Sequence, residues 1–448
     1  MKTQNTSPLV NWIDKTVAKR IVIWTLIFLG IIWLMAPLLN RPVLQPIFND
    51  WVMKGEGVAS FPMWGYSWLI RLLGSVTSVV ILQSVLGAFA TAALMVRLNC
   101  LFPRAKMLTT ILFITAIPWF SFMAYAYQMP ISSALMILTL LALEMALSSS
   151  RISLGVIAGF IIGMGQNFRS ELFLLPTAIL VLVFIFGKLK WFRYASLKPL
   201  LVCIGVALVL QVPWALNCYY NARHFSFSES NFGHVAYLGL GTIPSNPWKV
   251  DPQDSFAQET VEKAGLNYYS LSFEGGEFLK QKFFDGIRQY PLDYVKCIGA
   301  RIVGTVAHPF ASLSLASPTE GMQGVSKMLK TKPTVVPGAE TIAPSAIKTA
   351  FSWLYFIASG ILNRAISILG IIGFFLAFRK GPFRLEQPIV LLLTIVILYR
   401  CGLNIALFPS GKYMTSVYLC YLPFVVNTCW FVKEKLQRNS IKLETSKM

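Results

Sequence analysis

The chain has 448 residues, of which 55% are hydrophobic and only 13% are charged. About a quarter of the residues of a soluble globular domain are charged, so this composition excludes an ordinary soluble enzyme and predicts an integral membrane protein. The net charge of +20 does not predict a nucleic-acid-binding protein, because the basic residues fall between apolar runs instead of forming one solvated patch.

Apolar runs of roughly 20 residues, long enough to cross about 30 Å of hydrocarbon, recur along the chain. They predict an all-α membrane protein with about ten transmembrane helices. The first run follows Lys15, Lys19 and Arg20 and has no recognisable cleavage site, so we expect it to stay as an anchor. The predicted spans are 21–39, 75–96, 107–126, 131–149, 152–167, 171–187, 199–216, 364–379, 387–405 and 413–432.

Lysines and arginines between the predicted spans favour one orientation, because cytoplasmic loops carry an excess of them. A cytoplasmic N-terminus places these residues in alternate loops and in the C-terminal tail, and leaves few of them in the opposite short loops. We therefore predict a multi-pass protein of the plasma (inner) membrane with both termini cytoplasmic. The basic residues concerned are Arg97, Arg104, Lys106, Arg151, Lys188, Lys190, Arg193, Lys198, Arg379, Lys380, Arg384, Lys433, Lys435, Arg438, Lys442 and Lys447.

The spacing of the spans divides the chain into three predicted domains. Residues 1–216 form an N-terminal transmembrane module whose first outer loop covers 40–74. Residues 217–363 form a periplasmic or extracellular domain, and residues 364–448 form a C-terminal transmembrane module with a basic cytoplasmic tail. We recognise no internal repeat of the kind that marks the two halves of a secondary transporter.

The predicted outer domain contains amphipathic helices. Apolar spacing predicts one helix from Phe278 to Ile287, which Pro291 ends, and a second from about Leu292 to Val306. We expect both helices to lie on the membrane surface. The apolar and aromatic stretch 349–362 is predicted to be an interfacial helix that leads into the eighth span.

The cysteines and histidines do not predict a metal site. None of the seven cysteines belongs to a C-x-x-C spacing, and the three histidines, His224, His234 and His308, lack an H-x-x-x-H spacing. No glycine-rich phosphate-binding loop occurs either. We expect no cofactor, with a divalent metal as the less favoured alternative.

Five stretches follow one another along the chain. They are FND with FPMWGYSWLIRLL, GMGQNFRSELFLLP, VPWALNCYYNARHFSF, FFDGIRQYPLDYVKCIGARI and LFPSGKYMTSVYLCYLPFVV. Together they resemble the polytopic GT-C glycosyltransferases of the protein mannosyltransferase and aminoarabinose transferase type. Ser170, Asn217 and Lys412 stand where that family usually has Pro, Arg and Arg, and Gln128 stands where it often has an acid.

The resemblance implies a GT-C-like helix bundle with a periplasmic or extracellular α-rich domain. It also implies a donor sugar on polyprenyl phosphate, transferred with inversion to an acceptor on the outer face of the membrane. The expected partners are therefore this lipid-linked donor, membrane lipid, and a lipid, glycan or protein acceptor. The sequence does not identify the sugar or the acceptor.

An inverting transfer needs a carboxylate that accepts the proton of the acceptor hydroxyl. Asp50 is predicted to be this general base, because it follows the first span near the tryptophans Trp51 and Trp64, which are natural interface residues. The resembled family has its outer-loop acid at the same place. Glu56 is a second acid candidate, and the alternative for both residues is a solvated loop acid.

The leaving phosphate needs cations or backbone donors as charge builds on it. Arg169 and Lys412 are predicted to bind the donor phosphate, with Arg301 and Arg223 as further candidates and Glu171 in an orienting role. Charges at membrane depth usually face a cavity or a partner. The alternative is that Arg169 and Glu171 cap their helices or pair with each other. The predicted substrate-lining residues are Trp64, Tyr66 and Tyr413.

Three other functions remain open. A transporter or flippase of polyprenyl-linked sugars is typified by inverted repeats, broken helices or charges at mid-span. A polymerase or ligase of lipid-linked glycans would use Arg301 and His308 in place of Asp50. In a non-catalytic scaffold, Asp50 and Arg169 would be replaceable. We favour the glycosyltransferase because the acid, the cations and the outer domain occur in the expected order.

Overall fold

The structure is a computed structural model of the chain. It describes residues 15–35, 65–124, 128–189, 196–228, 231–243, 245–307, 346–378, 381–407 and 414–445, and for 346–359 and 441–445 it describes the backbone alone. Every regular element within these ranges is a helix and none is a strand, as predicted for an all-α protein.

Proline and serine explain where many of the helices begin. A proline occupies one of the first two positions of α6 (Ile117–Met123), α9 (Leu175–Lys188), α10 (Lys198–Val209), α11 (Val212–Ala222) and α18 (Pro388–Ala406). Proline fits there because the first N–H groups of a helix have no intrahelical partner.

Serine caps two further helices. The hydroxyls of Ser75 and Ser272 each accept a 3.0 Å hydrogen bond from a backbone N–H in the first turn of α4 (Val76–Leu101) and α14 (Phe273–Gln289). Such a cap satisfies one of the N–H groups that a helix start leaves without a partner.

Seven helical segments within the described residues are long and apolar enough to cross a membrane, so the chain is a helical membrane protein. Each of the seven overlaps a predicted span. They are Lys15–Leu34 in α1 (Lys15–Met35), Val76–Leu101, Gln128–Ser149, Ser170–Lys188, Lys198–Ala222, Gly360–Ala377 and Pro388–Ala406.

The three other predicted spans differ from the expectation. In place of one helix over 107–126, the segments Pro103–Ile114 and Ile117–Met123 are bent by 51° at their break, and they add an eighth span only if they are counted together. Pro118 lies at this break and has no N–H with which to continue the helical ladder. The bent pair comprises η1 (Pro103–Ala105), α5 (Lys106–Ile114) and α6.

The remaining two predicted spans are helical but do not count among the seven. The span 152–167 is α8 (Ile152–Gln166), which is apolar but has only 15 residues. The span 413–432 falls largely in α20 (Tyr418–Thr445), which contains Pro423 and continues into a charged tail. The count of about ten spans therefore stays a prediction.

Glycines bring α8 very close to α10. Gly155, Gly159 and Gly163 are four residues apart and share one face of α8. A Cβ atom at Gly155 would lie 2.3 Å from the carbonyl oxygen of Pro199, and one at Gly159 would lie 2.6 Å from that of Cys203. Small residues at this spacing let membrane helices approach to backbone contact. This contact positions the C-terminal end of α8, where the candidate site begins.

One helix replaces a predicted pair. The expected interfacial helix 349–362 and the expected span 364–379 form the continuous helix α17 (Ala346–Ala377). No proline interrupts this stretch of 32 residues, so nothing in it ends the helix. The helix packs closely on α20, since a Cβ atom at Gly373 would lie within bonding distance of the carbonyl oxygen of Phe424.

The segment predicted as the outer domain has a small core of its own. This core joins α12 (Phe232–Gly239), η3 (Leu240–Thr242), α13 (Asp254–Lys263), α14 and α15 (Pro291–Ala307). The two helices predicted around Pro291 are α14 and α15, and α14 begins earlier than expected, at Phe273.

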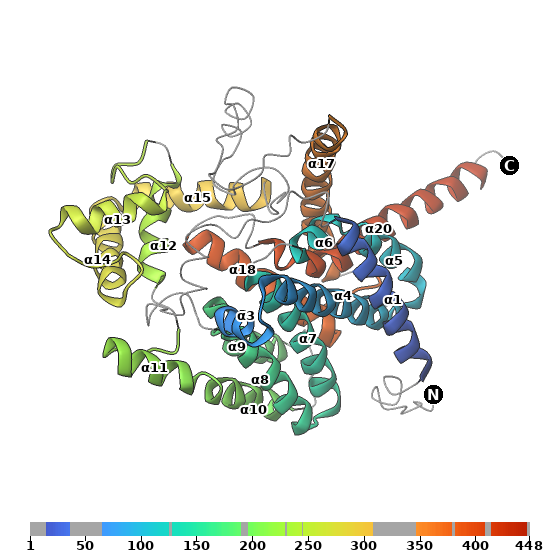
Figure 1. The fold of residues 1–448 in the computed structure, drawn as a ribbon. Helices are drawn as coiled ribbons and strands as arrows, with labels where there is room; N and C mark the ends of the chain where they lie inside the picture. Colours follow the sequence, from blue (N-terminus) through green and yellow to red (C-terminus); the bar gives the residue numbers. More distant parts are fainter. Residues whose placement is uncertain are drawn as a thin grey trace.

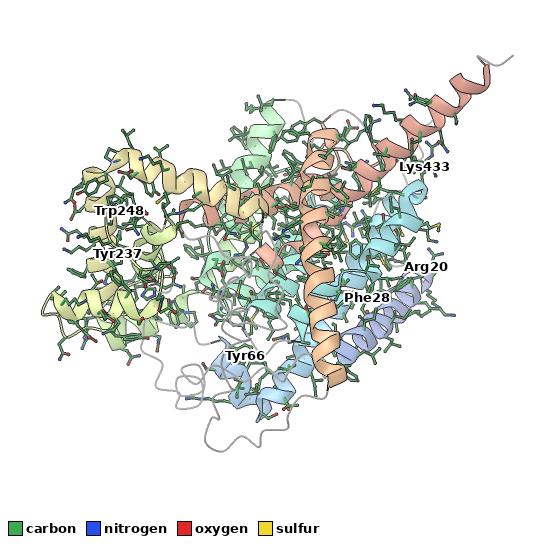
Figure 2. The ribbon with its side chains drawn as sticks, turned by 90° about the horizontal axis from the view of Figure 1, so that it is seen from above. Arg20, Phe28, Tyr66, Tyr237, Trp248 and Lys433 are labelled. Atoms are coloured by element: carbon green, nitrogen blue, oxygen red, sulfur yellow. The ribbon has the colours of Figure 1, made fainter. Side chains whose placement is uncertain are left out.

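The helices of the predicted outer domain lie at one end of the molecule, and the first and last helices lie at the other. The helices α1 and α20 lie on the side of the molecule opposite α12, α13 and α14 (Figure 1). Tyr237 and Trp248 mark the latter end, whereas Arg20 and Lys433 mark the former (Figure 2). This arrangement is compatible with the predicted orientation, and which end faces the cytoplasm remains a prediction.

One basic residue that supported the predicted orientation is not in a loop. Arg97 lies inside α4 and is buried, with its Nε 3.0 Å from Oε2 and its Nη2 2.7 Å from Oε1 of Glu144. Glu144 belongs to α7 (Gln128–Ser149) and is also buried. A charge that is neutralised inside the bundle does not indicate on which side a loop lies. The predicted orientation of this loop therefore depends on Arg104 and Lys106.

Candidate functional site

Several predicted site residues lie outside the described part of the chain. These are Asp50, Glu56, Trp64, Lys412 and Tyr413, together with His308. The described candidates are Arg169, Glu171, Arg301, Arg223 and Tyr66, and the structure brings some of them together.

Arg169, Glu171 and Arg400 form a buried cluster, named here the arginine–glutamate cluster. The Nε of Arg169 donates to Oε1 of Glu171 at 2.6 Å, and Nη1 of Arg400 donates to Oε2 of the same carboxylate. The side chains of Arg169 and Arg400 are 5% and 2% exposed and that of Glu171 is 16% exposed. The pairing of Arg169 with Glu171 was one of the two alternatives that the sequence left open.

The cluster depends on the turn between α8 and α9. The chain leaves α8 at Asn167, adopts extended backbone at Arg169, and forms the single turn η2 (Ser170–Leu172) before α9 begins. This turn brings the carboxylate of Glu171 to Arg400 of α18, with Arg169 on its other oxygen. Among the described residues, two guanidinium groups therefore share one carboxylate.

Arg400 is the residue that the sequence analysis missed. It lies within an apolar span, in the stretch ILYRCGLN, and a charge in such a place is costly unless it has a partner. The cost of a charge at this position was the signal in the sequence that Arg400 has a partner. The preceding residue adds a second bond to the same turn, because the hydroxyl of Tyr399 donates to the backbone carbonyl of Glu171. The Nε of Arg400 has no hydrogen-bond partner among the described residues.

Gln128, which stands where the resembled family often has an acid, lies against the cluster. With its amide turned to satisfy both neighbours, Gln128 donates to the carbonyl of Phe168 and accepts from Nη1 of Arg169, both at 3.0 Å. Gln128 is buried at the first position of α7. Gln128 is a neutral acceptor for Arg169, so it adds no negative charge beside the two guanidinium groups, as an acid would.

The predicted catalytic loop returns to the bundle beside the cluster. The N–H of Gly65, which opens α3 (Gly65–Leu73), donates to the carbonyl of Asn167 at 2.9 Å. A Cβ atom at Gly65 would lie 2.5 Å from that oxygen, so the contact requires glycine.

Tyr66 continues the same contact. It is buried with Ile131 and Phe168, so the end of the loop is held at the turn that carries Arg169. Burial raises the pKa of the Tyr66 phenol, which therefore stays neutral.

Arg301 is buried at the C-terminal end of α18. Its Nη1 donates to the carbonyls of Ile405 and Ala406 at 3.1 and 2.8 Å, and its Nε donates to Thr242 Oγ1 at 3.3 Å. The guanidinium also lies 5.6 Å from the ring centre of Tyr294. A cation suits these carbonyls because the last turn of a helix is electronegative.

Arg400 belongs to the last part of α18, and Arg301 of α15 donates to the carbonyls at its end. Five or six residues of helix, about 8 Å, separate Arg400 from the carbonyls that Arg301 caps. The arginine–glutamate cluster and the Arg301 cap therefore concentrate three arginines around the end of one helix.

Arg223 is placed differently. It is exposed and ends α11 in the left-handed conformation, with φ of 53°, while its N–H donates to the carbonyl of Tyr219. No contact within the described residues joins Arg223 to the arginine–glutamate cluster.

The described residues contain no group of three or more His, Cys, Asp or Glu side chains that could hold a metal ion. The expectation of a metal-independent protein stays a prediction, since several acids lie outside these residues.

Comparison with known proteins gave no match: no family model, no curated protein and no solved structure is significantly similar to this chain. The resemblance to GT-C glycosyltransferases accordingly rests on the five sequence stretches alone. The function of the site is therefore inferred from the chemistry of its residues.

Proposed function

We propose that this protein is an inverting glycosyltransferase that uses a polyprenyl-phosphate sugar as donor. In this proposal it transfers the sugar to a hydroxyl or phosphate of a lipid, glycan or protein acceptor on the outer face of the membrane. The observation that carries the proposal is the position of Gly65. Gly65 belongs to the same predicted outer loop, 40–74, as Asp50, and its N–H is hydrogen-bonded to the turn that holds Arg169 and Glu171.

The charges of the cluster fit a phosphate leaving group. Among the described residues two arginines share one carboxylate, and guanidinium groups form strong charge-assisted hydrogen bonds with phosphate. Buried charges in membrane proteins usually face a partner, a pathway or a site. Lys412 follows the end of α18 along the chain, so it is a further cation for the same phosphate.

The proposed reaction is a single displacement. Asp50 accepts the proton of the acceptor hydroxyl, whose oxygen attacks the anomeric carbon opposite the leaving group. The bond between that carbon and the phosphate oxygen breaks, and polyprenyl phosphate leaves with the electron pair. Arg169, Arg400 and Lys412 stabilise the charge that develops on the phosphate, and Glu171 keeps the two arginines in position.

Two alternatives receive less support. The polymerase or ligase alternative assigns the chemistry to Arg301, but this side chain is fully buried and already donates to two backbone carbonyls. The transporter alternative relies on broken or mid-span features, and Pro103–Met123 is a bent helix pair of that kind. A transporter would bind the lipid-linked sugar without transferring it, whereas the enzyme would transfer it.

The test compares wild type with Asp50→Asn, both purified in detergent and checked for folding. Each receives a pool of radiolabelled polyprenyl-phosphate sugars and a membrane extract as acceptor. The matched control is Asp251→Asn, which removes an exposed acid from the predicted outer domain. Loss of a general base lowers the rate by about 10²- to 10⁴-fold, and we expect Asp50→Asn to show such a loss while the control keeps its activity.

The outcomes separate the alternatives. Equal transfer by wild type and Asp50→Asn would show that Asp50 is a loop acid and not the base. If neither protein transfers label but both bind the lipid-linked sugar, the transporter becomes the better explanation.

A further inference from the structure

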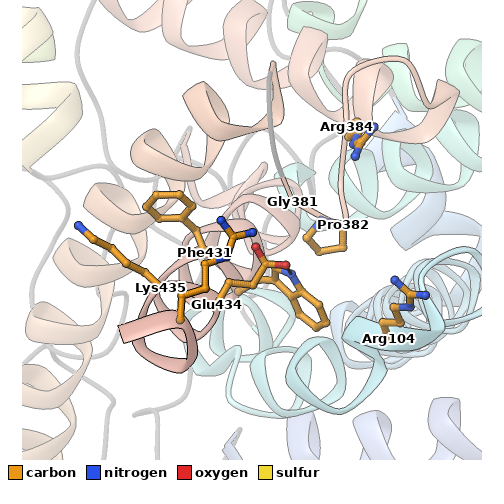
Figure 3. A pocket seen from close by; sticks show the side chains of 9 residues that line it. Arg104, Gly381, Pro382, Arg384, Phe431, Glu434 and Lys435 are labelled. Atoms are coloured by element: carbon orange, nitrogen blue, oxygen red, sulfur yellow. Dashed lines mark hydrogen bonds between the residues drawn. The ribbon is translucent and has the colours of Figure 1, made fainter. Parts of the chain in front are cut away.

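A basic pocket lies at the end of the molecule that Arg20 and Lys433 mark in Figure 2, away from the arginine–glutamate cluster. Its volume is about 540 Å³, within the roughly 300–1,000 Å³ that small-molecule sites usually have. Three segments line it: η1 after α4, the turn that begins at Gly381, and the polar part of α20. Arg104 and Arg384 lie on one side and Lys435 on the other (Figure 3).

Buried contacts hold the walls of this pocket in place. Asn427 of α20 is fully buried, accepts from the N–H of Phe383 at 2.9 Å and donates to its carbonyl at 2.7 Å. The ring of Phe383 packs on that of Phe102 at 4.2 Å between centroids. Because Phe102 and Phe383 precede Arg104 and Arg384, this packing brings the two arginines to the same wall.

The turn itself requires glycine. Gly381 has φ of 110°, a conformation that other residues rarely adopt, and a Cβ atom there would lie 2.7 Å from Oδ1 of Asn427. The pocket is therefore formed by the packed fold and does not depend on surface side chains alone.

The pocket carries a net charge of +3, from Arg104, Arg384, Lys435 and Arg438 against Glu434. Oε1 of Glu434 accepts a 3.0 Å bond from the indole N–H of Trp430, and Arg384 lies 3.6 Å from Glu386. The other three cations make no ion pair with a described residue. Unpaired cations around a concave site are suited to a ligand with more than one negative charge.

We propose that this pocket binds the headgroup of an anionic membrane lipid that carries two phosphate charges. Trp430, Phe431 and Pro382 also line the pocket, and α20 leads from it directly into the apolar bundle. Aromatic side chains beside basic ones are typical of the interface where headgroups lie, and basic pockets between membrane helices bind such headgroups. A free di- or polyphosphate shares the charge but not the apolar part.

The experiment measures lipid binding to the full-length protein by native mass spectrometry in detergent. The probe is diphosphatidylglycerol, with phosphatidylcholine as the zwitterionic reference and inorganic pyrophosphate as the soluble competitor. Arg384→Gln/Arg438→Gln removes two cations of the pocket. Arg20→Gln/Arg151→Gln, at exposed positions that do not line it, removes the same charge and is the matched control.

We expect the pocket variant to bind diphosphatidylglycerol at least about tenfold more weakly than wild type, since each tenfold corresponds to about 1.4 kcal/mol. The control variant should bind as wild type does, and Arg384→Lys/Arg438→Lys should recover most of the loss. Equal weakening in the control would mean non-specific attraction and would overturn the proposal. So would unchanged binding in the pocket variant, or displacement of the lipid by pyrophosphate at equal concentration.

Discussion

Among the described residues, two buried ion clusters differ in how their charges are paired. Between α4 and α7, Arg97 and Glu144 form a two-bond pair of one cation with one anion. Between the α8–α9 turn and α18, Glu171 is shared by Arg169 and Arg400, so that two cations face one anion.

This difference indicates different roles. A neutral, well-formed pair satisfies itself, and its net effect on stability compared with apolar residues is close to zero. Two buried guanidinium groups that share one carboxylate are costly to desolvate, and an anion bound beside them would lower their free energy. The comparison therefore assigns a structural role to Arg97 and Glu144 and supports a phosphate-binding role for Arg169 and Arg400.

The largest expected effect comes from breaking the neutral pair. Glu144→Gln leaves the buried Arg97 without a countercharge, which costs about 3–5 kcal/mol. We expect a large drop in the apparent melting temperature in detergent and a low yield of folded protein. The double variant Arg97→Met/Glu144→Leu should restore both, because it removes the two charges together. A single variant as stable as wild type would show that the pair is not buried as described.

Arg400→Gln should act mainly on function. It leaves the bond between Arg169 and Glu171 in place, so the fold is kept. Loss of one donor to a developing charge lowers the rate about 10²- to 10³-fold, and we expect that loss in the transfer assay. Arg97→Met/Glu144→Leu is the matched control and should transfer normally. Normal transfer together with a lowered melting temperature in Arg400→Gln would make this cluster structural as well.

Gly65→Ala tests whether the predicted catalytic loop is held at the cluster. Its Cβ atom would lie 2.5 Å from the carbonyl oxygen of Asn167, and overpacking of this kind costs about 1–3 kcal/mol. We expect a moderate fall in melting temperature and in transfer rate. Gly30→Ala in α1 is the control, because nothing lies within 4 Å of its Cβ position. Identical behaviour of the two variants would contradict the close contact.

The smallest effect is expected at the surface. Lys263 and Glu259 form a 3.2 Å pair on α13 whose side chains are 74% and 55% exposed. Solvent screens such pairs, so Lys263→Ala should change the free energy of unfolding by no more than about 0.5 kcal/mol. Melting temperatures at low and high salt provide the measurement. A loss comparable to that of Glu144→Gln would show that burial is not what separates the two kinds of pair.

Part of the candidate site was predictable from local sequence. Arg169 and Glu171 stand two residues apart between apolar runs, so their pairing was an open alternative and the structure shows it. Arg400 was not assigned to the site, although its position inside an apolar span was a signal that it has a partner. Its partner, Glu171, lies far from it in the sequence, and no local pattern identifies which acid that is.

The helix boundaries show the same limit. Composition and apolar runs determined the all-α membrane class, because the length and hydropathy of a span are local properties. The bend at Thr115 and Ala116 and the unbroken helix α17 went unpredicted. Pro118 and the absence of proline from 346–377 were local signals for them, but neither signal gives the bend angle or the helix length.

The sequence by itself therefore determined the class of this protein, most of its spans and the chemistry of its candidate residues. The tertiary structure decided which charges are paired, which share one partner, and that Gly65 is bonded to the turn beside Arg169. The physical reason is that a charge in a membrane protein takes its role from the partners that packing brings to it. Those partners lie on other helices, at distances along the chain that no local pattern spans.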